Sequence, residues 1–297
     1  LEGAIAFFLN GLPRSGDYDC VVALSGGKDS SFTLKRLVEV YRMRCLAVLV
    51  DNGFISEQAL KNCHYMCAGL DVDLQIFKPS PVFMEGMYRE SVRAKSLHVT
   101  SAVKRASDIC NSCINLINNH MVKTAVQVGA PVVAGGYIGG QVPRNSAVLD
   151  FSLLKLNTAN RAQRERYIQA LGPQSTRYFS VPNITTQDNI RISIINPMLA
   201  LSLAEDAIVA DLEAFGWRKS LDTGRNSSNC LLNDLGVLLH RTKYGFHPYM
   251  FEVAEQVRAG LVSRQEAIEK VEETLHLEDF SKQIQKLGLS HEDFRVF

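Results

Sequence analysis

Several features that would place this chain in a familiar class are missing from its sequence. No uninterrupted apolar run reaches the roughly 18 residues that a membrane-spanning helix needs. Basic and acidic residues balance at 32 and 31, for a formal net charge of +1, so no whole-molecule basic field points to nucleic acid. The seven cysteines are odd in number and irregularly spaced, which argues against a disulfide-linked secreted scaffold. The apolar opening, residues 1–9, lacks a basic region, so we expect a first core helix rather than a signal peptide, and a cytoplasmic protein.

What the sequence does contain is the patterning of a globular α/β protein. Its 297 residues are 46% hydrophobic and 21% charged, which is enough for a sizeable core. Five runs read as strands and are apolar throughout, as in a parallel sheet that is covered on both faces. Helical patterns between the runs supply the crossovers that parallel order requires. The expected strands are residues 20–24, 46–50, 72–77, 131–134 and 192–195.

The expected fold is therefore α/β and doubly wound, with a mostly parallel five-stranded sheet and a helical C-terminal extension. We place the boundary after residue 232, which gives a core domain of residues 1–232 and a helical region of residues 233–297. Residues 141–190 show no clear period apart from a helix near residues 160–171, and this stretch could form a substrate lid.

A glycine turn joins the first expected strand to the helix that follows it. Paired glycines let the backbone pass close to a ligand, and the free N–H groups of a helix's first turn favour an anion there. The spacing differs from the G-x-x-x-x-G-K-[ST] loop, so transfer of the γ-phosphate is not expected. The turn reads Ser25-Gly26-Gly27-Lys28-Asp29-Ser30.

This turn resembles the S-G-G-x-D-S signature of the PP-loop, or N-type, ATP pyrophosphatases. The resemblance implies an adenine nucleotide alpha hydrolase-like fold and cleavage of ATP between its α and β phosphates. It implies that Ser25, Gly27 and Ser30 donate to the pyrophosphate. By the same resemblance Lys28 supplies a compensating charge, and Asp29 is a catalytic residue that reaches Mg²⁺.

Other candidates stand where expected strands end, because ligands of such sheets bind beyond the carboxyl ends of the strands. Asp51 follows the second strand and could contact Mg²⁺ or the nucleotide. Gly135 and Gly136 follow the fourth strand and could allow the backbone to approach the adenosine. Four further residues could contact phosphate or the acceptor, although a surface or capping role suits them equally: Arg144, Arg225, His240 and His247.

Three cysteines stand in polar surroundings. Cys110 and Cys113 lie i and i+3 at the expected start of a helix, where the helix dipole should favour their thiolates, and Cys230 lies in a polar loop. The other four fall within apolar patterns and should be core residues, although two of them, four apart on one helix face, leave open a metal site. These four are Cys20, Cys45, Cys63 and Cys67.

Cys110, Cys113 and Cys230 together resemble the C-x-x-C plus distant Cys of PP-loop tRNA thiolases and of small-molecule thiolases such as 6-thioguanine synthetase. The resemblance implies three catalytic thiolates that hold a [4Fe-4S] cluster; a persulfide on one cysteine, resolved by another, is the alternative. The C-terminal segment, with Gly245-Phe246-His247-Pro248-Tyr249, looks like that of PP-loop sugar amidotransferases.

The function that these resemblances imply is ATP-dependent thiolation. The enzyme would adenylate a carbonyl oxygen of an acceptor, release pyrophosphate, and replace the oxygen with sulfur while AMP leaves. A small acceptor such as a nucleobase or nucleotide is favoured over tRNA, and a cysteine desulfurase or C–S lyase could donate the sulfur. An amidotransferase that uses ammonia, tRNA 2-thiolation and a non-catalytic nucleotide sensor stay open as alternatives. A homodimer is compatible with the sequence, and no membrane partner is expected.

Overall fold

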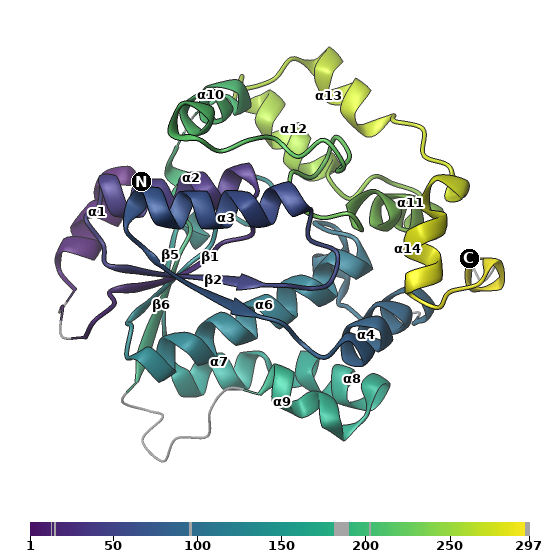
Figure 1. The fold of residues 1–297 in the computed structure, drawn as a ribbon, viewed down its shortest axis with the longest axis horizontal. Coiled ribbons are helices and arrows are strands. Elements are labelled where there is room, and N and C mark those ends of the chain that lie inside the picture. Colours follow the sequence, from purple (N-terminus) through teal and green to yellow (C-terminus); the bar gives the residue numbers. More distant parts are fainter. Residues whose placement is uncertain (13, 15, 95–96, 181–189, 202, 295–297) are drawn as a thin grey trace.

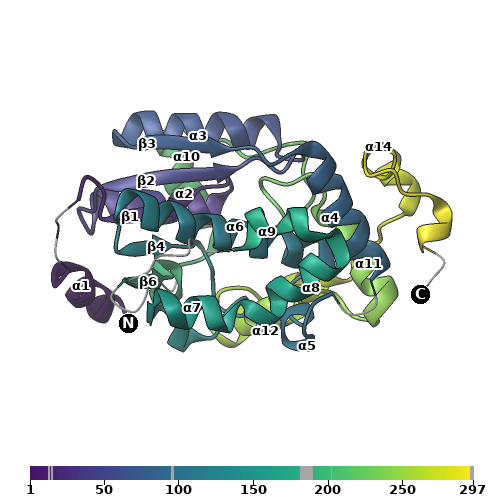
Figure 2. The same cartoon turned by 90° about the horizontal axis from the view of Figure 1, so that it is seen from below.

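The computed structural model describes the whole chain except residues 13, 15, 95–96, 181–189, 202 and 295–297. Its centre is a six-stranded sheet in the order β3-β2-β1-β4-β6-β5, visible from β3 to β6 in the turned view (Figure 2). Every neighbouring pair is parallel except β5 and β6. The strands are β1 (Cys20–Ala23), β2 (Cys45–Val50), β3 (Asp73–Phe77), β4 (Val132–Ala134), β5 (Val148–Ser152) and β6 (Arg191–Ile195).

Helices cover both faces of the sheet, as the doubly wound prediction requires (Figure 1). Successive side chains of a strand point to opposite faces of the sheet, so Cys20 and Val22 of β1 pack into the core on one face and Val21 packs into the core on the other. One face carries α1 (Glu2–Asn10), α2 (Lys28–Glu39), α3 (Glu57–Leu70) and α10 (Glu205–Phe215). The other face carries α6 (Asp108–Val128) and α7 (Leu153–Ala159). The α/β class and the five predicted strands are confirmed.

A sixth strand, β5, was not predicted. It pairs antiparallel with β6 at the edge of the sheet, with Asp150 opposite Ser193. Its residues are only partly buried, so they do not form the continuous apolar run that marks the central strands. The rest of the stretch at residues 141–190 holds α7, α8 (Arg161–Leu171) and α9 (Thr176–Phe179), while part of the suggested lid lies outside the described residues.

Two helices of the core begin at serine residues that cap them. The Ser56 side chain accepts a hydrogen bond from the N–H of Ala59 at the start of α3, and Ser107 accepts one from Cys110 at the start of α6. The remaining α-helices among the described residues up to 232 are α4 (Pro81–Arg93) and α5 (Thr100–Val103). Short 3₁₀ turns include η1 (Arg144–Ser146), η2 (Pro173–Ser175) and η4 (Pro197–Ala200).

The C-terminal region is helical, as predicted, and is packed against the core. Leu235 and Leu239 share a buried cluster with Val50, Met84 and Ile109 of the core elements. The helices are α11 (Asn233–Tyr244), α12 (Met250–Arg258), α13 (Arg264–Val271) and α14 (Ser281–Lys286), with 3₁₀ turns η5 (Leu277–Phe280) and η6 (His291–Phe294). Within the described part of the chain, no helix combines the length and the apolar character needed to cross a membrane.

Candidate functional site

The turn between β1 and α2 has the backbone geometry that its glycines predict. Gly26 has a φ of +75°, and a Cβ built on it would lie 1.9 Å from the carbonyl oxygen of Ala59. Any L side chain here would therefore collide with the backbone of α3 as well as strain the turn. Gly27 is the N-cap of α2, so the turn delivers the chain directly into the helix.

The carbonyl group of Gly26 is fixed by two side chains from distant parts of the chain. The indole N–H of Trp217 donates to this oxygen at 2.8 Å, and the amide of Asn62 donates to it at 3.1 Å. Trp217 and Asn62 are each 1% exposed, so both bonds lie out of water. Hydrogen bonds from α3 and from the segment after α10 thus fix the orientation of the Gly26 carbonyl group and, with it, of the turn.

Hydroxyl groups line the other side of the turn. The Ser30 hydroxyl accepts from the backbone N–H of Ser25 at 3.1 Å and lies 3.0 Å from the Ser25 hydroxyl. The backbone N–H of Lys28 donates to the hydroxyl of Ser228 at 3.1 Å, which joins the turn to a loop 200 residues away. The predicted donors Ser25, Gly27 and Ser30 are therefore gathered at the start of α2.

Lys28 and Asp29 form an ion pair at the same place. The ammonium group lies 2.9 Å from the Asp29 carboxylate and 3.7 Å from that of Glu205. Burial alone would lower the pKa of Lys28, but these two carboxylates outweigh it and raise the pKa above its ordinary value. Lys28 is therefore a fixed positive charge beside the turn.

Asp51 lies directly after β2 and already has two partners. Its carboxylate pairs with Lys78 at 2.9 Å and accepts from the N–H of Gly53 at 2.9 Å. Burial tends to raise its pKa, but Lys78 and Gly53 outweigh burial and hold the pKa below its usual value. A Mg²⁺ ion at Asp51 would have to share the carboxylate with Lys78, and the role of Asp51 stays a prediction.

Gly135 and Gly136 follow β4, and the second of them touches the turn. A Cβ on Gly136 would lie 2.9 Å from the backbone nitrogen of Ser30, and one on Gly135 would lie 3.0 Å from Oδ1 of Asn196. The backbone at Gly136 thus lies close to the first turn of α2. Contact with the adenosine stays a prediction.

The structure brings Cys110 and Cys113 of α6 into one neighbourhood with Cys230. The Asn52 amide nitrogen donates to the sulfur of Cys113 at 3.5 Å and to that of Cys230 at 3.8 Å. The Asn233 amide donates to the sulfur of Cys110 at 3.8 Å. All three side chains are partly exposed. Cys230 also stands two residues after Ser228, whose hydroxyl accepts from the backbone N–H of Lys28, so one loop contacts the turn at residues 25–30 and carries one of the three thiols. The proximity of all three thiols to that turn stays a prediction.

The prediction that the helix start favours thiolates is wrong for these cysteines. Burial raises the pKa of Cys110 to about 11 and that of Cys230 to about 12, with the neighbouring thiols adding to the shift in both. Burial also raises the pKa of Cys113, against the opposing hydrogen bonds from Asn52 and Tyr88. Desolvation of the charged form outweighs the helix dipole, so free thiols here are protonated at neutral pH.

The other cysteines are buried in the core, as predicted. Cys20 and Cys45 face each other in register on β1 and β2, and burial raises the pKa of Cys63 and of Cys67 to about 12. Across the described ranges, no group of three or more His, Cys, Asp or Glu side chains is placed to hold a metal ion.

The four additional candidates divide into two kinds. His240 and His247 are buried, at 2% and 5% exposure, and burial lowers the pKa of each to about 4. They are neutral at pH 7 and cannot supply a positive charge for phosphate. Arg225 is exposed and lies 4.0 Å from Glu273. Arg144 lines the pocket described next.

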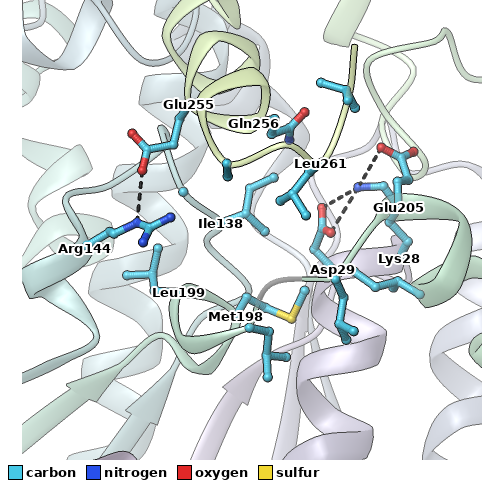
Figure 3. Close-up of a pocket in the computed structure, with 16 residues that line it drawn as sticks. Lys28, Asp29, Ile138, Arg144, Met198, Leu199, Glu205, Glu255, Gln256 and Leu261 are labelled. Carbon is cyan, nitrogen blue, oxygen red and sulfur yellow. Dashed lines mark hydrogen bonds and ion pairs between the residues drawn. The ribbon is translucent and has the colours of Figure 1, made fainter. Parts of the chain in front are cut away.

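A pocket opens beside Lys28 and Asp29, between the core and the C-terminal region (Figure 3). Its wall is mostly aliphatic, from Ile138, the η4 turn and the residues after α12. Arg144 pairs with Glu255 at 3.1 Å, and Lys28 pairs with Asp29, so both cations among the described lining residues are already matched by carboxylates. The aliphatic lining consists of Ile138, Met198, Leu199, Leu201, Leu203, Ile208, Ala259, Leu261 and Val262.

Comparison with known proteins identifies a relative for the C-terminal segment. Residues 236–297 match the family described as "LPS biosynthesis protein WbpG-like, C-terminal domain". This match confirms the resemblance of the C-terminal segment to sugar amidotransferases. The chain is also 26% identical over 278 residues to an uncharacterized protein of Methanocaldococcus jannaschii, covering 93% of this chain and 80% of the relative.

Two solved structures show partial similarity. The U34-tRNA thiolase NcsA from Methanococcus maripaludis with its [4Fe-4S] cluster is 14% identical, with a TM-score of 0.38 over 88% of this chain and 81% of that chain. The NH3-dependent NAD synthetase from Campylobacter jejuni in complex with the nitrate ion is 13% identical, with a TM-score of 0.35. That match covers 47% of this chain and 56% of the synthetase.

Three residues that shape the site were not predicted. Trp217 fixes the carbonyl of Gly26, Ser228 binds the N–H of Lys28, and Asn52 binds two cysteine sulfurs. Each contact joins segments that are far apart in the sequence. The available signals were the single tryptophan of the chain and the position of Asn52 at a strand end.

Proposed function

We propose that this protein is an ATP-dependent thiolating enzyme of the PP-loop type. It activates a carbonyl oxygen of a small acceptor as an adenylate and then replaces that oxygen with sulfur. The observation that carries the proposal is the connection between the turn at residues 25–30, which we call the nucleotide end of the site, and the three cysteines, which we call its sulfur end. Ser228 binds the backbone of the nucleotide turn, and Cys230, two residues later, shares Asn52 with Cys113.

The nucleotide end supplies a cradle for the pyrophosphate that leaves. The acceptor's carbonyl oxygen attacks the α-phosphorus, the bond to the β-phosphate breaks, and pyrophosphate departs toward the first turn of α2. Backbone N–H groups and the hydroxyls of Ser25 and Ser30 are suited to an anion in this position. Asp29, which pairs with Lys28 in the structure, is the carboxylate that we propose would hold a Mg²⁺ ion, and the ion would neutralise phosphate charge when bound. With Asp29 on the ion, the charge of Lys28 would be available to the pyrophosphate.

The sulfur end supplies thiols rather than a base for ammonia. A sulfur nucleophile adds to the activated carbon, and AMP leaves with the original oxygen, which completes the exchange. Because the resting thiols are protonated, Cys110, Cys113 and Cys230 need deprotonation before they can act.

Three gathered thiols suit sulfur transfer through a persulfide. One cysteine would carry the outer sulfur; once that sulfur has attacked the activated carbon, a second thiol would break the S–S bond, and the resulting disulfide would be reduced by an external thiol, whereas free sulfide can act as the nucleophile directly. Three cysteines are also the residue type that holds a [4Fe-4S] cluster, but within the described residues they are not placed to hold a metal ion. As persulfide or as free sulfide, the sulfur comes from outside, and a cysteine desulfurase or C–S lyase is the donor that we propose.

The pocket beside Asp29 favours an uncharged acceptor. Its aliphatic wall suits the face of a ring, whereas Lys28 and Arg144 are already paired with carboxylates. Among the described lining residues, both cations are already in ion pairs, so neither is available to bind the phosphate of a phosphorylated acceptor or of an RNA backbone. A nucleobase or similar carbonyl heterocycle is therefore favoured over a nucleotide or tRNA.

Amidation is the second candidate, and the C-terminal match favours it. The WbpG-like segment packs α12 against the core so closely that a Cβ on Gly140 would lie 2.3 Å from Cα of Glu252. If the protein is an amidating enzyme, ammonia displaces AMP from the activated acceptor, and the three cysteines have only a structural role.

One experiment separates the two candidates. The anaerobically purified protein, with ATP and Mg²⁺, is given a panel of uncharged nucleobases and either sulfide or ammonium, and products are identified by mass spectrometry. Thiolation predicts AMP, pyrophosphate and a sulfur-containing base with sulfide only. An amino product with ammonium, formed equally well by a Cys110→Ala, Cys113→Ala, Cys230→Ala triple variant, would assign the protein to amidation.

A further inference from the structure

Asn52 occupies a special position in the thiol neighbourhood. It follows β2 by two residues and is only 4% exposed. Its amide nitrogen lies 3.5 Å from the sulfur of Cys113 and 3.8 Å from that of Cys230. One amide nitrogen therefore lies within hydrogen-bonding distance of two sulfur atoms from segments more than a hundred residues apart.

The orientation of this amide is set by the backbone. The Asn52 side-chain oxygen accepts a hydrogen bond from the N–H of Phe54 at 2.8 Å, so the nitrogen has to face the sulfurs. The opposite arrangement would place two hydrogens against the N–H donor of Phe54.

The same turn is held to the Cys230 segment by backbone hydrogen bonds. The N–H of Leu231 donates to the carbonyl of Phe54 at 2.9 Å, and the N–H of Ser56 donates to the carbonyl of Asn229 at 2.9 Å. Asn52 and Cys230 thus belong to one small ladder, centred on the bridge between Ile55 and Cys230.

A second possible donor lies near Cys113. Tyr88 is fully buried, its hydroxyl makes no hydrogen bond of ordinary geometry with another described residue, and it is close enough to Cys113 for each group to shift the pKa of the other. A buried hydroxyl without a partner is costly, and an electron-rich sulfur beside it would satisfy it.

We propose that Asn52 is a positioning residue, which holds the sulfur atoms of Cys113 and Cys230 on one amide and stabilises negative charge on both, while Tyr88 stabilises negative charge on Cys113 alone. Hydrogen bonds to the charged form of a group favour that form, and donors of this kind suit anionic sulfur better than a neutral amine. Use of this arrangement in sulfur transfer rests on the proposed function, but the arrangement itself belongs to the resting protein.

The test measures the reactivity of each thiol at one fixed, mildly alkaline pH. Reduced, metal-free protein is treated with iodoacetamide, and the alkylation rates of Cys110, Cys113 and Cys230 are followed by peptide mass spectrometry. Asn52→Asp keeps the size of the side chain and an oxygen for Phe54, but replaces the donor with an acceptor. We expect Cys113 and Cys230 to react about tenfold more slowly relative to Cys110, since a hydrogen bond to a charged group contributes on this order.

A merely structural role for Asn52 predicts the opposite sign, because loosening the turn would expose the thiols and make them react faster. Asn52→Ser provides a second variant: its hydroxyl can still close the turn but is too short to reach the sulfurs, and it adds no charge. Slowing of Cys113 and Cys230 in both variants supports the proposal. Unchanged or faster rates in a folded Asn52→Ser protein would overturn it.

Tyr88→Phe checks that the effect follows individual contacts. It should slow Cys113 alone and leave Cys230 at the rate of the unmodified protein. Tyr41→Phe is the matched control, since Tyr41 also carries a buried hydroxyl that has no hydrogen-bond partner within the described part of the chain, but it belongs to the opposite core cluster. The alkylation rates need neither ATP nor acceptor. If the protein turned out not to thiolate an acceptor, the expected effects of the variants on these rates would still hold. If the variants did not change the rates as expected, the role of Asn52 would be wrong, but the proposed thiolation would still be open to its own test.

Discussion

The hydroxyl of Ser228 accepts a hydrogen bond of 3.1 Å from the backbone N–H of Lys28. That N–H belongs to the first turn of α2, where the pyrophosphate is proposed to bind, and Ser228 precedes Cys230 by two residues. The nearby hydroxyl of Ser227 accepts from the N–H of Cys230 at 3.0 Å, so the whole turn is ordered by its serines. One short loop thus links the nucleotide turn to the thiols.

Ser228→Ala should therefore uncouple the two half-reactions. Loss of one hydrogen bond, about 1 kcal/mol, should lower sulfur incorporation about fivefold while AMP formation in the presence of acceptor stays near its original rate. Both rates are measured on the same samples by chromatography and mass spectrometry. Ser263→Ala, which removes an exposed helix cap far along the chain, is the control. Equal losses of both activities would show that Ser228 serves the nucleotide turn alone.

Asp29→Asn should abolish most ATP cleavage without unfolding the protein. The carboxylate is placed at the first turn of α2 beside Lys28, and its loss removes the proposed contact to Mg²⁺. We expect AMP formation to fall about a hundredfold, the scale of removing one preorganised charge-stabilising group. Asp211 lies on the neighbouring α10 and forms an ion pair with Lys35 of α2; Asp211→Asn breaks this pair and should keep full activity. Normal turnover by Asp29→Asn, or ADP as the product, would contradict the assignment of the turn.

Gly26→Ala should lower the free energy of unfolding by more than the strain of a positive φ angle alone would lower it. An alanine there adds a 1.9 Å collision with the carbonyl of Ala59 to the strain of a φ of +75°. Gly129→Ala is the matched control, because Gly129 has a φ of +69° and open space around its Cβ position. The control should lose about 1 kcal/mol of unfolding free energy in urea, and Gly26→Ala clearly more, together with AMP formation. Similar losses in the two variants would mean that the turn can move away from α3.

Buried histidines should make the protein sensitive to mild acid. Burial lowers the pKa of His98, His240 and His247 from 6.5 to about 4. Between these values the unfolded chain binds more protons than the folded protein. The stability that these neutral histidines contribute is complete above pH 6.5 and is lost as the pH falls toward 4.

His240→Leu isolates one of these contributions, since neither ring nitrogen of His240 has a hydrogen-bond partner among the described residues. The slope of unfolding free energy against pH, measured by urea denaturation between pH 4.5 and 6, should be smaller in the variant by up to about 1.4 kcal/mol per pH unit. Identical slopes for the two proteins would show that His240 is already protonated, or exposed, in the folded state.

The central fold could be predicted because its signals are local. Strands β1, β2 and β4 are buried on both faces, so each is a short apolar run that is recognisable without knowing its neighbours. Strand β5 gives no such signal, since Asp150 and Ser152 alternate with apolar residues at an edge where burial is partial. Its presence depends on pairing with β6, which lies about forty residues later in the chain.

The same distinction applies to the site. The nucleotide turn is a continuous motif whose glycine and helix geometry follow from the sequence, whereas Trp217, Ser228 and Asn52 act through contacts between distant segments. The thiolate prediction failed for the same reason. A helix start is visible in the sequence, but the burial that raises the pKa of Cys110 to about 11 is created by α11 and the other elements packed around it.

The central claim is that ATP activates an acceptor oxygen that sulfur then replaces, and an isotope label follows that oxygen directly. The base that yields product in the nucleobase panel is prepared with ¹⁸O at its carbonyl and incubated with the protein, ATP, Mg²⁺ and sulfide. We predict AMP that carries one ¹⁸O atom and a product that carries sulfur in place of the label. Unlabelled AMP, or a product that retains ¹⁸O, would contradict it.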